Sequence, residues 1–230
     1  MKYRHIFFDL DHTLWDFDKN AEETLHELYH SYSLHQYGIA APDLFIETYT
    51  RNNHALWADY HLGRITKDYL RQRRFTQTFL ELGMSPHDIP ASFEEDYVRI
   101  CPTKRNLFPD THETLSYLKE RYVLHLISNG FLAATRTKIE LSDLGKYFST
   151  VVISELVGVN KPDRAIFEFA LQGAEATKNE SLMIGDSLEA DVHGALSFGM
   201  DAIFFNSQNK CHPGGRYLQI TRLQELKKLL

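Results

Sequence analysis

The sequence predicts an α/β fold: a five-stranded parallel Rossmann-like sheet with helices on both faces and an inserted four-helix bundle. Two observations support this prediction. From about Leu107 onward, short apolar runs alternate with amphipathic segments, which is typical of parallel strands joined by helices. From Trp15 to Thr103 the chain is amphipathic and almost free of β-type runs, which indicates a helical insertion after the first strand.

The predicted strands are short runs rich in β-branched and aromatic residues. They cover Ile6–Phe8, Val123–Ile127, Val151–Ile153, Leu182–Ile184 and Ala202–Phe205. The helices expected between them cover Asp110–Arg121, Leu132–Leu141, Arg164–Gly173 and Glu189–Phe198. Nearly continuous apolar runs of this kind are expected of parallel strands, because both faces of such a sheet are buried.

The insertion is predicted to contain four helices separated by short turns. The first covers Glu22–Tyr37, where leucine and tyrosine side chains recur at helical spacing. Pro42 begins the second helix and Gly63 ends it, and Thr66 caps the third. The segment Gly83–Pro86 separates the third helix from the fourth.

Two domains are therefore expected. Residues 1–14 and 105–230 should form the α/β core domain. Residues 15–104 should form a helical cap domain. The cap is a candidate lid, because it is inserted directly after the first strand, whose carboxyl end lies at the edge where ligands bind.

Charge and cysteine content exclude several classes of protein. The 230 residues carry a formal net charge of −6 with a pI near 6.0, which argues against a general binder of nucleic-acid polymers or anionic membranes. Cys101 and Cys211 are too few for a disulfide framework or a cysteine-based zinc site. The sequence shows neither a signal peptide nor a membrane-spanning run, so we expect a cytoplasmic protein. We further expect a monomer or a weak homodimer.

Polar residues follow the predicted strands where each strand ends. They are Asp9 and Asp11 after the first strand, Ser128 and Asn129 after the second, Lys161 in a loop before a helix, and Asp186 after the fourth. Each motif alone also fits a turn or a helix cap. Because the carboxyl ends of parallel strands meet at one edge, the motifs together predict a single site there.

Asp9 and Asp11 lie close together with no basic residue among them. Two such carboxylates repel each other, and a divalent cation is the usual remedy. The alternative is a polar turn that caps the following helix. With the other motifs present, the pair predicts a metal site at the end of the first strand.

On these motifs the chain resembles the haloacid dehalogenase superfamily of phosphatases over essentially its whole length. Asp9-Leu10-Asp11-His12-Thr13 is similar to the first motif of that family, Ser128-Asn129 to the second, Lys161-Pro162 to the third, and Gly185-Asp186-Ser187 through Asp191 to the fourth. The helical insertion is similar to the family's small α-helical cap. His12 and Arg164 depart from the residues common at their positions, and neither departure removes a catalytic group.

The resemblance implies a magnesium-dependent phosphatase that works through an aspartyl-phosphate. Asp9 is the expected nucleophile, and Asp11 is the expected general acid and base. Mg²⁺ would be held by Asp9, Asp186 and the backbone carbonyl of Asp11, because it prefers hard oxygen ligands. The other expected roles are phosphate binding by Lys161, Ser128 and the Asn129 N–H, orientation of Lys161 or a metal-bound water by Asp191, and a hydrogen bond within the first loop by Thr13.

A narrower resemblance is to the pyrimidine 5′-nucleotidase branch of this superfamily. It rests on Asp9–Phe17, on Asn53–Trp57 and on Arg74-Phe75. It implies that the substrate is a nucleoside 5′-monophosphate or a related small phosphorylated metabolite. The cap should then set specificity, and its candidate residues are Phe17 at the hinge, Asn53, Trp57 and Arg74. Alternatively, Trp57 belongs to the core of the bundle, and Arg74 belongs to a solvated face of its helix.

Three other activities compete with hydrolysis. A dehalogenase expels halide and needs no general acid, and members of that branch lack an acid at the position of Asp11. A phosphomutase of the same superfamily would keep every motif. A phospho-accepting or binding module without turnover would need neither the helical insertion nor Asp11.

Overall fold

The computed structural model describes residues 2–211 and 217–230. The chain divides into two compact units. Met1–Phe17 and Arg105–Leu230 form the first, which we call the α/β unit, and Asp18–Lys104 form the second, the helical unit. None of the helices in the described ranges is both long enough and apolar enough to span a membrane.

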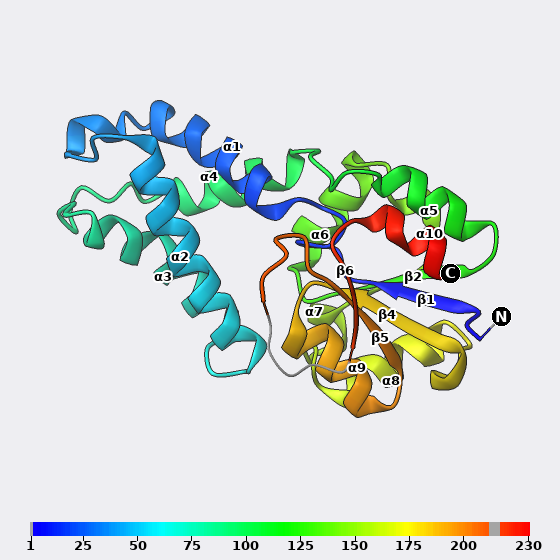
Figure 1. The fold of residues 1–230 in the computed structure, drawn as a ribbon. Coiled ribbons are helices and arrows are strands. Elements are labelled where there is room, and N and C mark those ends of the chain that lie inside the picture. Colours follow the sequence, from blue (N-terminus) through cyan, green and yellow to red (C-terminus); the bar gives the residue numbers. More distant parts are fainter. Residues whose placement is uncertain (1, 212–216) are drawn as a thin grey trace. The chain divides into compact units, whose positions relative to one another are not determined.

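The α/β unit contains a parallel sheet with six strands in its described residues, in the order β3-β2-β1-β4-β5-β6 (Figure 1). The strands are β1 (His5–Phe8), β2 (Val123–Ser128), β3 (Phe148–Ile153), β4 (Ser181–Gly185), β5 (Asp201–Phe205) and β6 (Leu218–Ile220). The predicted strands are confirmed as β1 to β5. The predicted number is wrong, because β6 is a short edge strand whose Leu218 and Gln219 are exposed, and no apolar run marks it.

Strand β1 lies at the centre of the sheet, between β2 and β4. All four of its residues are buried, as expected of a central parallel strand. Phe8 lies in register with Leu126 of β2 and with Ile184 of β4. The carboxyl ends of these three strands therefore meet at one edge, and the loops that follow them are brought together.

Helices cover both faces of this sheet, with α5 and α10 on one side and α8 and α9 on the other (Figure 1). The helices of the unit are α5 (Thr111–Lys119), α6 (Leu132–Leu141), α7 (Ser154–Val157), α8 (Arg164–Gly173), α9 (Gly194–Phe198) and α10 (Leu226–Leu229). The predicted bounds of α6 and α8 agree with the structure. The helix predicted over Glu189–Phe198 differs, because a π-helical turn (Leu188–His193) precedes α9. Such turns often occur at functional sites.

Four α-helices are described for the helical unit. They are α1 (Phe17–Ser31), whose first residue belongs to the α/β unit, α2 (Pro42–His61), α3 (Lys67–Glu81) and α4 (Phe93–Ile100). Helix α1 ends earlier than predicted, where Ser33 adopts a left-handed φ of 49° and a short 3₁₀ turn (Leu34–Tyr37) follows. Thr66 caps α3 as predicted, since its side chain accepts a hydrogen bond from the backbone N–H of Tyr69.

A buried histidine pair in the sheet makes the stability of the fold depend on pH. Nδ1 of His5 on β1 lies 3.0 Å from Nε2 of His125 on β2, and both residues are buried. Burial lowers the pKa of His125 from 6.5 to about 4, and it also lowers the pKa of His5. Between pH 6.5 and 4, His125 therefore binds a proton in the unfolded chain but not in the folded one, and the contribution of His125 to stability is lost as the pH falls.

We expect the free energy of unfolding to fall by about 1–3 kcal/mol over this pH window through His125. Urea unfolding of the wild type and of His125→Gln, measured at intervals between pH 7 and 4, checks this expectation. The variant should show a shallower fall in stability than the wild type. Equal slopes for the two proteins would show that the pair does not titrate as stated.

Candidate active site

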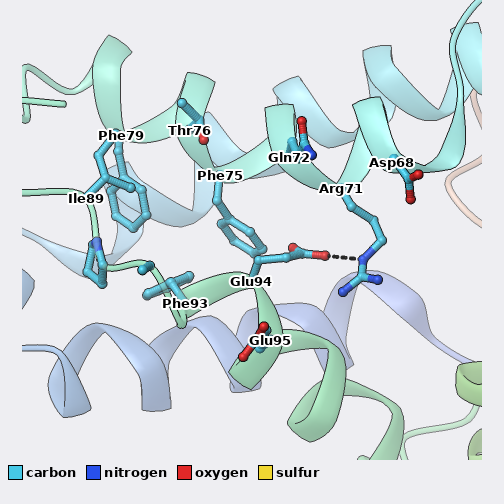
Figure 2. Close-up of a pocket in the computed structure, with 12 residues that line it drawn as sticks. Asp68, Arg71, Gln72, Phe75, Thr76, Phe79, Ile89, Phe93, Glu94 and Glu95 are labelled. Atoms are coloured by element: carbon cyan, nitrogen blue, oxygen red, sulfur yellow. Dashed lines mark hydrogen bonds and ion pairs between the residues drawn. The ribbon is translucent and has the colours of Figure 1, made fainter. Parts of the chain in front are cut away.

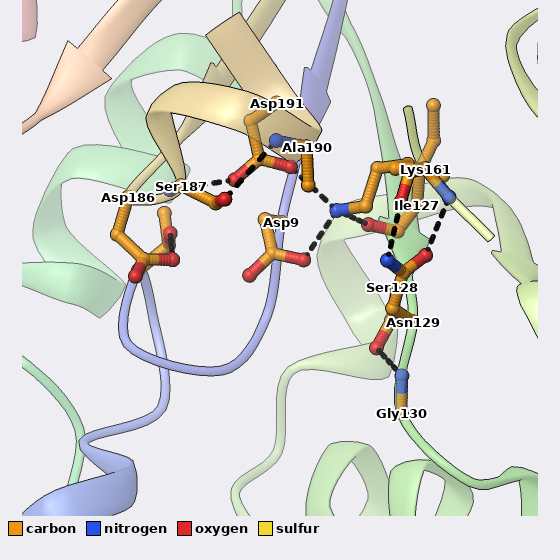
Figure 3. Close-up of polar contacts among 11 residues, drawn as sticks. Asp9, Ile127, Ser128, Asn129, Gly130, Lys161, Asp186, Ser187, Ala190 and Asp191 are labelled. Atoms are coloured by element: carbon orange, nitrogen blue, oxygen red, sulfur yellow. Dashed lines mark hydrogen bonds and ion pairs between the residues drawn. The ribbon is translucent and has the colours of Figure 1, made fainter. Parts of the chain in front are cut away.

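The predicted motifs meet at the carboxyl edge of the sheet (Figure 3). Asp9 directly follows β1, Ser128 ends β2 and Asp186 directly follows β4. Lys161 comes from the loop between α7 and α8. Its ammonium group lies among Asp9, Ile127 and Asp191 (Figure 3). The structure thus brings together side chains that are far apart in the sequence.

Lys161 is the central cation of this cluster. Its Nζ lies 2.5 Å from Oδ1 of Asp9 and 2.7 Å from Oδ1 of Asp191, and it donates a hydrogen bond of 2.8 Å to the carbonyl of Ile127. The residue is 1% exposed. Burial alone lowers the pKa of Lys161, but the carboxylates of Asp191 and Asp9 raise it above its usual range, so the ammonium stays charged.

Asn129 fixes the loop that carries Lys161. Its side-chain Nδ2 donates to the backbone carbonyl of Lys161 at 2.9 Å, and its Oδ1 accepts from the backbone N–H of Lys161 at 2.8 Å. The backbone N–H of Asn129 was the group expected to bind phosphate. No motif in the sequence indicates the second role of the side chain, which is to hold the Lys161 loop against the end of β2.

Three carboxylates gather beside Lys161. Single oxygens of Asp9, Asp186 and Asp191 lie within 4.8 Å of one another. Burial raises the pKa of Asp9 to about 7, with Lys161 opposing that shift and Asp191 adding to it. Burial, followed by the charge of Asp9, raises the pKa of Asp186 well above its usual range. One lysine does not balance three clustered acids, of which Asp9 and Asp191 are buried and Asp186 is half-buried, and the all-oxygen donor set fits a hard divalent cation.

Two of the acids in this cluster, Asp9 and Asp186, are those expected to hold the metal, and Asp191 adds a third carboxylate. The side chain of Asp11 is paired with Lys138, and the expected role of the Asp11 backbone carbonyl stays a prediction. Asp191 also pairs with Lys161, as expected of a residue that orients it. The backbone N–H of Thr13 donates to the carbonyl of Leu10 at 3.4 Å, within the first loop as expected, and its hydroxyl donates a hydrogen bond of 3.2 Å to Oδ1 of Asp186. Thr13 links the first motif to the fourth.

Gly185 allows Asp191 to lie against the end of β4. A Cβ atom at Gly185 would lie only 2.2 Å from Oδ2 of Asp191, and the position therefore requires glycine. Oδ2 of Asp191 accepts a hydrogen bond from the backbone N–H of Ser187 at 3.0 Å. These contacts, with the π-helical turn, fix the carboxylate beside Lys161.

Lys138 is a residue of the site that no sequence motif identifies. It lies on α6, is 5% exposed, and places its Nζ 2.6 Å from Oδ1 of Asp11. The available signal was weak: a lysine on the inward face of the helix that follows Ser128-Asn129. Lysine is rarely fully buried unless it is paired, so its burial marks a specific partner.

Phe17 lies at the boundary between the two units, where α1 begins. Its ring centroid is 5.0 Å from that of His12 and 6.0 Å from that of Trp15. Within the α/β unit, Phe17 therefore belongs to the aromatic surroundings of the loop that carries Asp11. The role in substrate specificity that was expected of Phe17 stays a prediction.

The other specificity candidates belong to the helical unit. Arg74 is buried on α3, and its guanidinium makes two hydrogen bonds to Glu94 of α4, at 2.9 and 2.8 Å. Arg74 therefore lies in the interior of the unit. The alternative, that Arg74 belongs to a solvated face of the helix, is wrong. Asn53 is also buried on α2, and Trp57 is half-buried with its ring near those of Tyr60 and His61.

A pocket of about 350 Å³ lies between α3 and α4 in the helical unit (Figure 2). Its lining includes the acids Asp68, Glu94 and Glu95. The guanidinium of Arg71, also in the lining, is paired with Glu94 at 2.8 Å. Three carboxylates against one paired cation make this pocket unsuited to a phosphate group.

Comparisons with known proteins agree with this geometry. The family model described as haloacid dehalogenase-like hydrolase matches residues 3–199. The chain is 32% identical to the pyrimidine 5′-nucleotidase YjjG of Escherichia coli, over 100% of this chain and 99% of the relative. It is 34% identical to the pyrimidine 5′-nucleotidase PynA of Streptococcus pneumoniae, over 90% of this chain and 85% of the relative.

A solved structure gives the same result for the fold. The crystal structure of YfnB from Bacillus subtilis bound to magnesium has a TM-score of 0.87 with this chain and 26% sequence identity, and covers 100% of this chain and 99% of that one. The resemblance in the four motifs, the sheet order and the family match agree with one another. The chain therefore belongs to the haloacid dehalogenase-like hydrolases.

Proposed function

We propose that this protein hydrolyses phosphate monoesters through a phosphorylated Asp9. Its proposed substrates are nucleoside 5′-monophosphates, with a preference for pyrimidine nucleotides. The observation that carries the proposal is the position of the Asp9 carboxylate, at the sheet edge between the Lys161 ammonium and the acids Asp186 and Asp191. The nucleotide preference is supported by the similarity to YjjG and PynA, which are pyrimidine 5′-nucleotidases.

Asp9 and Asp186 are the side chains that would hold Mg²⁺, together with the backbone carbonyl of Asp11, and Asp191 lies within reach of the same ion. The excess of clustered carboxylates over the one lysine that pairs with them supports this assignment. When bound, the ion neutralises negative charge on the phosphate and on the nucleophile, which lets two anions approach each other.

In the first step of the proposed reaction, a carboxylate oxygen of Asp9 attacks phosphorus in line. The bond from phosphorus to the ester oxygen breaks, and Asp11 donates a proton to that leaving oxygen. In the second step Asp11 accepts a proton from water, which attacks the aspartyl-phosphate. Inorganic phosphate leaves and the carboxylate of Asp9 is restored.

Two further side chains stabilise charge on the transferring group. Lys161 lies 2.5 Å from Asp9 and can neutralise the equatorial phosphate oxygens. Ser128 Oγ accepts a hydrogen bond from the N–H of Gly130 at 3.0 Å, which leaves the hydroxyl proton available for a phosphate oxygen. The backbone N–H of Asn129 is proposed as a further donor.

The proposed function is tested by steady-state release of phosphate from a panel of pyrimidine and purine nucleoside monophosphates and sugar phosphates. We expect many turnovers per enzyme, with the highest kcat/KM for pyrimidine nucleotides. A phosphomutase would return isomerised sugar phosphates with little free phosphate. A binding module would release no more than about one equivalent per chain, and either result would contradict hydrolysis.

Magnesium dependence is a separate expectation. Excess chelator should abolish turnover, because without a cation the clustered acids lack a counter-charge. Added Mg²⁺ should restore turnover. Ca²⁺ should inhibit, since its larger size and looser coordination would misplace Asp9 relative to the phosphate. Phosphate release is measured with each ion added to metal-free enzyme. Full activity in excess chelator would rule out the metal site.

A further inference from the structure

Lys138 is a buried cation that the proposed reaction does not use. Its Nζ pairs with Oδ1 of Asp11 and lies 4.2 Å from the ring centroid of Trp15 and 5.4 Å from that of Phe17. Among the residues that the structure describes, Asp11 is its one acidic partner. A buried ammonium loses its hydration, and a carboxylate compensates for this only when the two side chains keep one geometry. The ion pair therefore restrains Asp11.

The second oxygen of the Asp11 carboxylate lies on the side of the expected phosphate-binding loop. A Cβ atom placed on Gly130 would lie 3.3 Å from Oδ2 of Asp11, 3.1 Å from Oγ of Ser128 and 2.6 Å from Oγ1 of Thr135. Oδ2 and the serine hydroxyl therefore share the space that the missing side chain of Gly130 leaves open. The side chain of Asp11 is 21% exposed, whereas that of Lys138 is 6% exposed.

The two oxygens of Asp11 thus have different surroundings. Oδ1 is engaged by a buried ammonium, and Oδ2 lies, like Oγ of Ser128, next to the Cα of Gly130 in the expected phosphate-binding loop. Rotation of the carboxylate away from this orientation would break a charge-assisted hydrogen bond and leave Lys138 buried without its partner. Helix α6 begins directly after the short segment Asn129–Phe131 that follows β2, so the helix that carries Lys138 is tied to the loop beside Oδ2.

We propose that Lys138 is a positioning residue for Asp11: it holds Oδ1 so that Oδ2 stays directed toward the phosphate-binding loop, ready to exchange a proton with the leaving oxygen and with water. This inference rests on the proposed function, because the orientation of Asp11 matters only if Asp11 transfers protons. Lys138 itself touches no reacting atom in this scheme.

The first test compares Lys138→Met with Lys138→Arg. Methionine keeps the apolar stem and removes the charge, and arginine restores a cation. For a pyrimidine nucleoside monophosphate we expect Lys138→Met to lower kcat by about 10–100-fold with KM changed by less than about threefold, since misplacing a catalytic group by about 1 Å costs on this scale. Lys138→Arg should recover most of the loss. Arg136→Met, an exposed charge on the same helix, is the matched control and should behave as wild type.

The second test separates positioning from a merely structural role. If Lys138 acts through Asp11, Asp11→Asn and Asp11→Asn/Lys138→Met should have the same kcat within about twofold, because the two residues then act as a unit. The double variant buries no unpaired charge at this ion pair, so the comparison holds even if Lys138→Met alone folds poorly. Thermal unfolding of every variant verifies that the fold is retained.

The outcomes are distinguishable. Wild-type enzyme without phosphatase activity overturns the proposed function and this inference together. The positioning role alone is overturned if the wild type turns over normally and one of three results is found. These are an unaffected Lys138→Met, an effect of Lys138→Met that is confined to KM, and fully additive losses in the double variant. Loss of kcat, rescue by arginine and non-additivity with Asp11→Asn support it.

Discussion

Asp9→Asn is expected to lower kcat by about 10⁴-fold or more, because asparagine cannot form the acyl-phosphate and the nucleophile acts as part of a unit with its neighbours. The fold should survive the change. The asparagine side chain is nearly isosteric, and Lys161 keeps its ion pair of 2.7 Å with Asp191. Phosphate release at saturating substrate and Mg²⁺ gives the rate, and circular dichroism with thermal unfolding verifies the structure.

Asp143→Asn is the matched control for this variant. Asp143 is an exposed residue of the α/β unit with a left-handed φ of 53°, a conformation that asparagine also tolerates. It should retain wild-type activity. Asp9→Asn with activity within about tenfold of wild type would show that another group attacks phosphorus, and the assignment of Asp9 as nucleophile would be wrong.

Asp11→Asn should lose about 10²–10⁴-fold in kcat for a nucleoside monophosphate, the typical contribution of a positioned proton-transfer group. The alkoxide of a nucleoside leaves poorly without a proton. The loss should be smaller for a nitrophenyl phosphate, whose leaving group needs little protonation. The rates of both substrates, measured with the same enzyme preparation, give the comparison.

With the activated ester, the activation of water by Asp11 should become limiting in this variant. Aspartyl-phosphate should then accumulate on the enzyme. Equal losses for both substrates, without a phosphoenzyme that can be trapped, would mean that Asp11 is not the acid and base. The Asp143→Asn protein again serves as the control, since it removes an exposed carboxylate that lies outside the motifs and outside the cluster of acids.

The position of the site could be predicted from the sequence because it depends on strand ends. Apolar runs identify buried strands, and parallel pairing brings the residues after β1, β2 and β4 to one edge. The same patterns do not identify β6, which has exposed residues and only a short length. They also miss the π-helical turn before α9, which contains Asp191 and replaces the α-helix expected over its first residues.

The contacts within the site could not be predicted in the same way. The bonds from Thr13 to Asp186 and from Lys138 to Asp11 join residues from separate loops and helices. Such bonds depend on side-chain rotamers and on the approach of segments distant in sequence, and no periodicity in the chain encodes them. Arg74 shows the same limit, because only the packing of α3 against α4 brings Glu94 to its guanidinium.

The central claim is that phosphate passes through a covalent bond to Asp9. The most direct measurement is acid quenching of Asp11→Asn during turnover of nitrophenyl phosphate, followed by intact mass and peptide mapping. We predict one phosphoryl group per chain, on the peptide that contains Asp9, and none in Asp9→Asn treated in the same way. A phosphoryl group on any residue other than Asp9 would contradict the account. So would normal hydrolysis by the wild type with no phosphoenzyme trapped in the wild type or in Asp11→Asn.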